Sequence, residues 1–112
     1  MRNIKFRAWI ESQKYMAIQG TPDLETLAGF MFHYGDEKLL MQSTELFDKQ
    51  GNEVFEMDYL QNNNGSFFLV KFTDGCFCLH NVANKNHYPL CKSMLENKTV
   101  ISNYYEYSKR KV

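Results

Sequence analysis

The strongest structural signal in the sequence is a pair of β-rich runs around Asp74-Gly75, which reads Phe67-Phe68-Leu69-Val70-Lys71-Phe72-Thr73-Asp74-Gly75-Cys76-Phe77-Cys78-Leu79-His80. Asp-Gly favours a two-residue type I′ turn, so the runs are predicted to form a β-hairpin. This turn sets the register, with Thr73 opposite Cys76, Phe72 opposite Phe77 and Val70 opposite Leu79. Alternation then places an apolar set on the core face, namely Phe68, Val70, Phe72, Phe77 and Leu79. The other face carries Leu69, Lys71, Thr73, Cys76, Cys78 and His80.

A second hairpin is predicted near the N-terminus. Residues 2–10 alternate between apolar and polar side chains, as a half-buried strand does. The polar residues 11–13 suit a short loop, so residues 14–18 are expected to return beside the first strand. Thr21-Pro22-Asp23 then has the composition of a helix start. The apolar stripe expected on that helix is Leu24, Leu27, Ala28 and Met31.

The remaining chain alternates short strands with turns. The predicted segments are extended chain from residue 38, a turn at 48–52, a strand at 54–55, a hairpin tip at 61–65, a loop at 81–87, a helix within 89–95, a strand over 99–107 and a basic tail at 108–112. In the helix, Leu90 and Met94 are expected to face inward. Seven candidate strands with one or two helices predict a β-rich α+β fold in one domain, residues 1–112.

The composition indicates a soluble globular protein of the cytoplasm. Leu, Ile, Val and Phe supply 28 of the 112 residues, which is enough for a core. No apolar run is long enough to cross a membrane, and three cysteines suit a reducing compartment. Thirteen basic and thirteen acidic residues give no net charge, so no long-range field attracts nucleic acid.

Four blocks, in this order along the chain, resemble the YopX family of phage and prophage proteins. They are residues 4–9 (Ile-Lys-Phe-Arg-Ala-Trp), 40–58, 72–77 and 100–106. The resemblance implies a small SH3-type barrel with an N-terminal hairpin and one or two short helices, and it transfers no catalytic residue. Glu45, Met57 and Ser102 stand where the family tends to have Gly. Glycine in such places often serves a positive φ, so either these turns differ or these residues carry strain.

The most concentrated chemical groups are Cys76, Cys78 and His80 on one strand face, followed by His87 and Cys91. Cysteine and histidine suit zinc, but two strand rises separate the Cys76 and Cys78 sulfurs by about 7 Å, which is too far for one tetrahedral ion. Packing as small half-buried thiols is the favoured interpretation. We therefore expect no metal, no cofactor and no catalytic cysteine.

Lys5, Arg7 and Trp9 share the predicted outward face of the first strand. Basic groups beside an aromatic ring suit single-stranded nucleic acid, although a cation–π contact on an ordinary sheet face explains the same pattern. This face supports the alternative hypothesis of a nucleic-acid-binding module.

Seventeen aromatic residues exceed what a small core readily buries. Tyr104, Tyr105 and Tyr107 lie on the predicted last strand, where alternate residues cannot all face inward. We therefore expect a protein partner or self-association through aromatic surface. The leading hypothesis is a non-enzymatic phage or prophage accessory protein that acts by macromolecular binding or self-assembly.

Overall fold

The computed structural model describes residues 5–10, 14–19 and 40–106. By its contacts the chain divides into two compact units, Met1–Ser43 and Thr44–Val112. The helix predicted to start at Thr21 lies outside the described residues.

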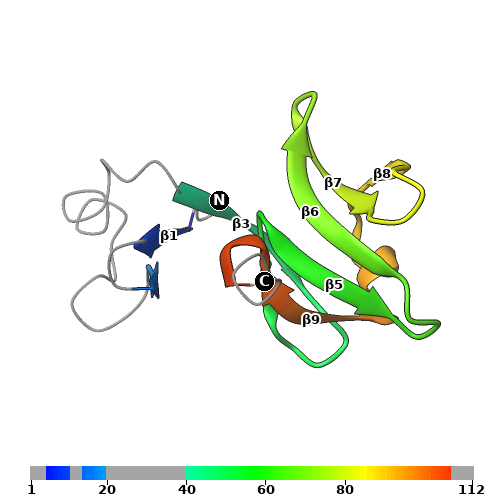
Figure 1. Cartoon of the computed structure of the whole chain (residues 1–112), viewed down its shortest axis with the longest axis horizontal. Helices are drawn as coiled ribbons and strands as arrows, with labels where there is room; N and C mark the ends of the chain where they lie inside the picture. The colour runs from blue at the N-terminus through cyan, green and yellow to red at the C-terminus, as the bar shows by residue number, and fades with distance from the viewer. Residues whose placement is uncertain (1–4, 11–13, 20–39, 107–112) are drawn as a thin grey trace. The chain divides into compact units, whose positions relative to one another are not determined.

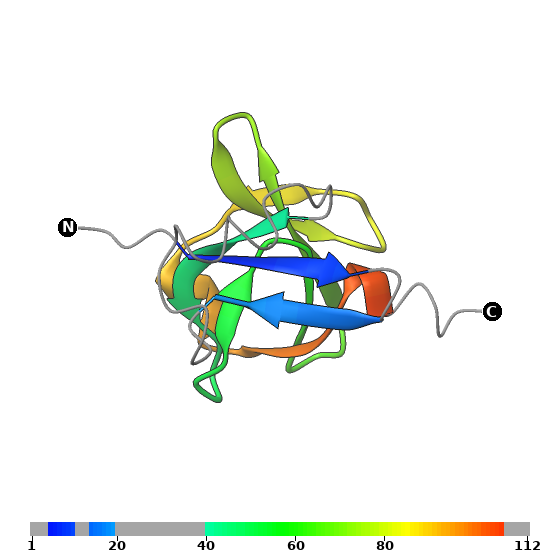
Figure 2. The ribbon, with the colours of Figure 1, turned by 90° about the vertical axis from the view of Figure 1, so that its left-hand side faces the viewer.

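The first unit contains the predicted N-terminal hairpin. Strands β1 (Phe6–Ile10) and β2 (Tyr15–Ile18) run side by side in opposite directions, with Arg7 opposite Ile18 and Ile10 opposite Tyr15 (Figure 2). The first residues of β3 (Leu40–Phe47) pair with the other edge of β1. β1 is therefore a central strand, and its Ala8 and Ile10 pack with Ala17 of β2 in a small core. The prediction of this hairpin is confirmed.

The second unit is built on a five-stranded antiparallel sheet with the order β8-β7-β6-β5-β9. Its elements are β4 (Glu53–Phe55), β5 (Asp58–Asn62), β6 (Phe67–Thr73), β7 (Cys76–Asn81), β8 (His87–Pro89), the 3-10 helix η1 (Lys92–Leu95) and β9 (Lys98–Asn103). The sheet curls into a half-barrel, visible in Figure 1. The strand-rich class is as predicted.

The core of this unit lies inside the curl. Its buried members are Val54, Leu60, Phe68, Val70, Leu79 and Leu95, which come from β4, β5, β6, β7 and η1. Leu90 and Met94 pack against this core but remain partly exposed. The helix is shorter than predicted because Pro89 pairs within β8 and the Leu90 N–H continues that pairing by donating to the Phe77 carbonyl at 2.9 Å. The residue that η1 buries is Leu95.

The β6–β7 hairpin has the predicted register throughout. Both turn residues have positive φ, 54° at Asp74 and 84° at Gly75, as a type I′ turn requires. Phe72, however, is 52% exposed, so its predicted burial is wrong. β5 pairs with β6 between Phe67 and Leu69, and the hairpin continues past that pairing to the tip that projects at the top of Figure 1.

The last strand ends earlier than predicted, at Asn103. The Asn103 side-chain oxygen accepts hydrogen bonds of 3.0 Å from the N–H groups of Tyr105 and Glu106, which cap one helical turn. The predicted strand over 99–107 is therefore wrong at residues 104–106, because an asparagine side chain competes with strand pairing for these donors, and residue 107 lies outside the described residues.

Two of the three positions at which this chain departs from the family glycines are in the left-handed region. Glu45 has φ 64° and Met57 has φ 70°, whereas Ser102 lies within β9. The backbone of Met57 also joins three segments, since its N–H donates to the Val70 carbonyl at 2.7 Å and its carbonyl accepts from the Tyr104 N–H at 2.8 Å. Residues other than glycine therefore occupy strained backbone positions, Glu45 within β3 and Met57 in the turn between β4 and β5.

Candidate functional site

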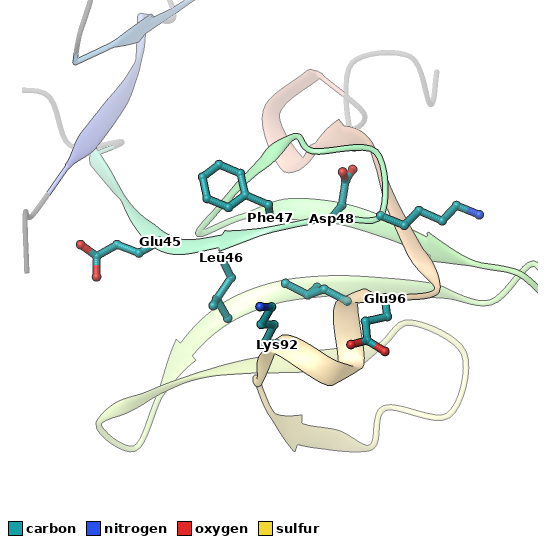
Figure 3. Close-up of a pocket in the computed structure, with 8 residues that line it drawn as sticks. Glu45, Leu46, Phe47, Asp48, Lys92 and Glu96 are labelled. Carbon is teal, nitrogen blue, oxygen red and sulfur yellow. The ribbon is translucent and has the colours of Figure 1, made fainter.

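A pocket of about 490 Å³ opens in the second unit beside the end of β3 and η1 (Figure 3). Its lining consists of Glu45, Leu46, Phe47, Asp48, Lys49, Lys92, Leu95 and Glu96. Leu46 and Phe47 leave the strand on opposite sides, with Leu46 directed toward η1. Phe47 is 56% exposed, a large fraction for a phenylalanine.

Asp48 holds the wall of this pocket in place. Its Oδ1 accepts from the N–H groups of Gln50 at 2.9 Å and Asn52 at 2.8 Å. Its Oδ2 accepts from the Val100 N–H at 2.8 Å and from the Asn52 side-chain amide at 3.1 Å. Burial alone raises the pKa of this carboxyl, but these donors outweigh it and hold the pKa below its ordinary value. Asp48 is thus a structural acceptor that ties the turn after β3 to β9.

Lys98 supports the opposite wall. Although it is a lysine, it is only 6% exposed, and its ammonium donates to the Met94 carbonyl at 2.7 Å and to the Asn97 side-chain oxygen at 3.1 Å. The same group lies 4.9 Å from the Phe68 ring centroid. Burial lowers the pKa of Lys98. These contacts close the end of η1, and the only sequence signal for them is a basic residue just after a short helix.

The pocket suits binding of an apolar group flanked by charge. Leu46 and Leu95 provide apolar lining, Phe47 lies on the other side of the same strand (Figure 3), and the charged lining residues are two lysines and three carboxylates. The eight lining residues include carboxylates and lysines, which can act as acids or bases, but no serine, cysteine or histidine.

A second cluster of chemical groups lies near the tip of the β6–β7 hairpin. The Cys76 and Cys78 sulfurs are 3.6 Å apart, so the predicted separation of about 7 Å is wrong. That value follows the backbone rise, whereas rotation about χ1 lets the two sulfurs lean together. Both thiols also approach the Thr73 carbonyl, at 3.6 Å from Cys76 and 4.0 Å from Cys78.

The neighbouring histidines do not complete a metal site with this thiol pair. His80 Nε2 lies 3.5 Å from the Thr73 hydroxyl, and its ring stacks on that of His87 at 5.1 Å. Burial, then the charges of His87 and Lys71, lower the pKa of His80. Within the described part of the chain, no three His, Cys, Asp or Glu side chains are grouped to hold an ion.

The third cysteine, Cys91, has a hydrogen-bond partner of its own. Its thiol is 3.2 Å from the Ser93 hydroxyl, and this hydrogen bond is the main cause that lowers the pKa of Cys91. Cys91 is exposed.

The residues predicted to form an interaction surface differ in how exposed they are. Arg7 is 6% exposed and Trp9 is 2% exposed, so the prediction that they lie on an outward strand face is wrong. Both faces of β1 are buried, because Ala8 and Ile10 are buried on the other side. Lys5 is half-buried.

The C-terminal tyrosines are more accessible. Tyr104 is 41% exposed, and its ring meets that of half-buried Tyr105 edge-to-face at 5.3 Å. Tyr107 lies outside the described residues.

No helix among the described residues is long and apolar enough to span a membrane.

Comparison with known proteins identifies the family and the fold. No curated protein matches the chain. A crystal structure of protein EF1440 from Enterococcus faecalis is similar, with a TM-score of 0.68 and 24% identity over 98% of this chain and 99% of that one. The family model described as YopX protein matches residues 21–110. The chain therefore belongs to the YopX family.

Proposed function

We propose that this YopX-family protein is a non-enzymatic accessory protein of a phage or prophage, which binds another protein, or a second copy of itself, in the bacterial cytoplasm. The family resemblance supports the phage context. The curled five-stranded sheet supports the SH3-type barrel that the resemblance implies. The contact surface that we assign is the pocket beside η1.

The observation that carries this proposal is the exposure of Phe47 at an apolar pocket. An aromatic ring 56% exposed beside a pocket of about 490 Å³ offers apolar area that a partner side chain can cover. Lys92 and Glu96 can orient a partner through charge. The pocket walls are fixed by Asp48 and Lys98, so little ordering entropy is lost on binding.

Protein is favoured over nucleic acid as the partner. The net charge is zero, and the basic and aromatic groups of β1 that would stack and contact phosphate are buried at Arg7 and Trp9. The lining of the pocket includes two lysines and three acidic residues, which do not form a basic surface.

Site-specific photo-crosslinking tests the proposal. A benzophenone amino acid at position 47 should yield one discrete protein adduct when the chain is expressed in the bacterial host. The matched control is the same group at position 72, since Phe72 is 52% exposed but lies at the hairpin tip. Mass spectrometry of the adduct separates a host or phage protein from a second copy, and both identities support the proposal.

Three outcomes contradict it. They are no adduct at position 47, an adduct to nucleic acid, or the same set of adducts from positions 47 and 72. Charge reversal gives a further check. If the charged residues Lys92 and Glu96 orient the partner, Lys92→Glu combined with the position 47 probe should reduce the adduct yield. An unchanged adduct yield would show that the charge of Lys92 does not orient the partner.

A further inference from the structure

We propose that Cys76 and Cys78 form a reversible redox modification site, which closes to an intrastrand disulfide by exchange with a low-molecular-weight disulfide such as oxidised glutathione. The inference does not depend on the proposed binding function. It rests on the distance between the two sulfurs and on their unequal exposure.

The two thiols are in non-bonded contact with each other. Their sulfurs are 3.6 Å apart, and a disulfide requires about 2.05 Å. Two antiparallel strand rises of about 3.4 Å separate the Cα atoms by about 6.8 Å, which is at the upper limit of about 6.8 Å for disulfides. The bond can form if the backbone of β7 contracts at Phe77, because the two Cβ atoms must approach to within about 4.5 Å.

The exposure of the two thiols assigns their order of reaction. Cys76 is exposed and can meet a small disulfide, whereas Cys78 is 4% exposed. Burial is the largest cause that raises the pKa of Cys78, followed by its hydrogen bond with Cys76. Cys78 is accordingly the weaker first nucleophile and suits the resolving role.

The exchange balances in two steps. The Cys76 thiolate attacks one sulfur of the small disulfide, forms a mixed disulfide and releases one thiolate. Cys78 then loses its proton to solvent, and its sulfur attacks the Cys76 sulfur and expels the second small thiolate, which takes up a proton. The two protein thiols are oxidised to one disulfide, and one small disulfide is reduced to two thiols.

The resulting bond should be easy to reduce. Its Cα separation lies at the stretched end of the disulfide range, and strained disulfides have more oxidising potentials. Contraction of β7 would also tilt Phe77, which lies between the two cysteines and whose ring meets Phe72 edge-to-face at 5.1 Å. The redox state of the pair would thus alter the aromatic groups at the hairpin tip.

Peptide mapping tests the site directly. The reduced protein is treated with excess oxidised glutathione, blocked with an alkylating agent and cleaved with trypsin. Cleavage after Lys71 and Lys85 leaves both cysteines in peptide 72–85, while Cys91 falls in peptide 86–92. Peptide 72–85 should lose the mass of two hydrogen atoms and take up neither glutathione nor alkylating agent, and dithiothreitol should restore both thiols.

Single variants separate this site from general thiol oxidation. Cys91→Ser should leave the change in peptide 72–85 intact. Cys78→Ser should trap glutathione on Cys76, because the resolving thiol is gone. A stable glutathione adduct on Cys76 in the unaltered protein, or a disulfide that links Cys91 to either member of the pair, would overturn the proposal.

The predicted tilt of Phe77 has its own measurement. Aromatic NMR resonances of Phe72 and Phe77 should shift on oxidation, while those of Phe68, which lies in the core, should hold. Unchanged Phe77 resonances in a protein shown by mass to be oxidised would contradict the contraction of β7.

Discussion

The Asp48 carboxylate accepts a hydrogen bond of 2.8 Å from the backbone N–H of Val100, 52 residues further along the chain. The same carboxylate satisfies two N–H groups of its own turn, those of Gln50 and Asn52. One side chain thus fixes both the local turn and a distant strand, which together support the pocket.

Replacement of Asp48 by Asn should destabilise the fold by about 1–3 kcal/mol, because an amide NH₂ cannot accept the hydrogen bond from Val100. Urea denaturation measures this loss. Asp74→Asn is the matched control, since Asn-Gly also favours a type I′ turn, and it should change stability by less than about 0.5 kcal/mol. Equal effects of the two variants would remove the special role of Asp48.

The stabilisation from Asp48 should depend on pH. The folded-state pKa of Asp48 is lowered, so its contribution is fully present above the unfolded value of about 3.9 and is lost as pH falls through the folded value. The stability difference between the unaltered protein and Asp48→Asn should therefore shrink in acid below about pH 4. A difference that stays constant from neutral pH into this acid range would show that the carboxylate charge contributes nothing.

Glycine at the two strained positions should stabilise the protein. Glu45→Gly and Met57→Gly each relieve a left-handed backbone conformation, which costs other residues about 1–2 kcal/mol. Chemical denaturation should show a gain of about 1 kcal/mol, less whatever side-chain contact is lost. Ser102→Gly, within β9, should instead destabilise by about 0.5–1 kcal/mol. The same sign at all three positions would contradict the role of positive φ.

Two hairpin residues should differ sharply in their contribution to stability. Leu79 is fully buried, so Leu79→Ala should cost about 2–5 kcal/mol. Phe72→Ala should cost about 1 kcal/mol, mostly from its contact with Phe77, and not the several kcal/mol expected of a core phenylalanine. Guanidinium denaturation of both variants checks this, and a similar cost for each would place Phe72 in the core after all.

Self-association, if a second copy is the partner, should persist at high salt. Burial of apolar area is not screened as ion pairs are, and the exposed aromatic groups include Phe47 and Tyr104. Light scattering at low and high salt measures the mass, and Phe47→Ser should reduce association without unfolding the domain. Dissociation on adding salt would indicate an electrostatic interface instead.

The sequence alone determined the features that depend on neighbours along the chain. Asp74-Gly75 specified its turn, and with it every pair in the β6–β7 register, because a two-residue loop leaves no other alignment. The N-terminal hairpin and the turn after β3 followed from local patterns in the same way. The family glycine positions left open either different turns or strain, and the positive φ angles favour strain at Glu45 and Met57 but not at Ser102.

Tertiary structure decided burial, because burial depends on which distant segment covers a strand. Alternation distinguishes the two faces of a strand, but it does not show how much of the strand is covered by other segments. Phe72 is exposed because it lies beyond the part of β6 that pairs with β5. Arg7 and Trp9, on the central strand β1, are buried. The pocket and the buried Lys98 arise where β3, β9 and η1 meet, and no local pattern encodes that meeting. The approach of the Cys76 and Cys78 sulfurs depends on side-chain rotamers, which backbone spacing does not determine.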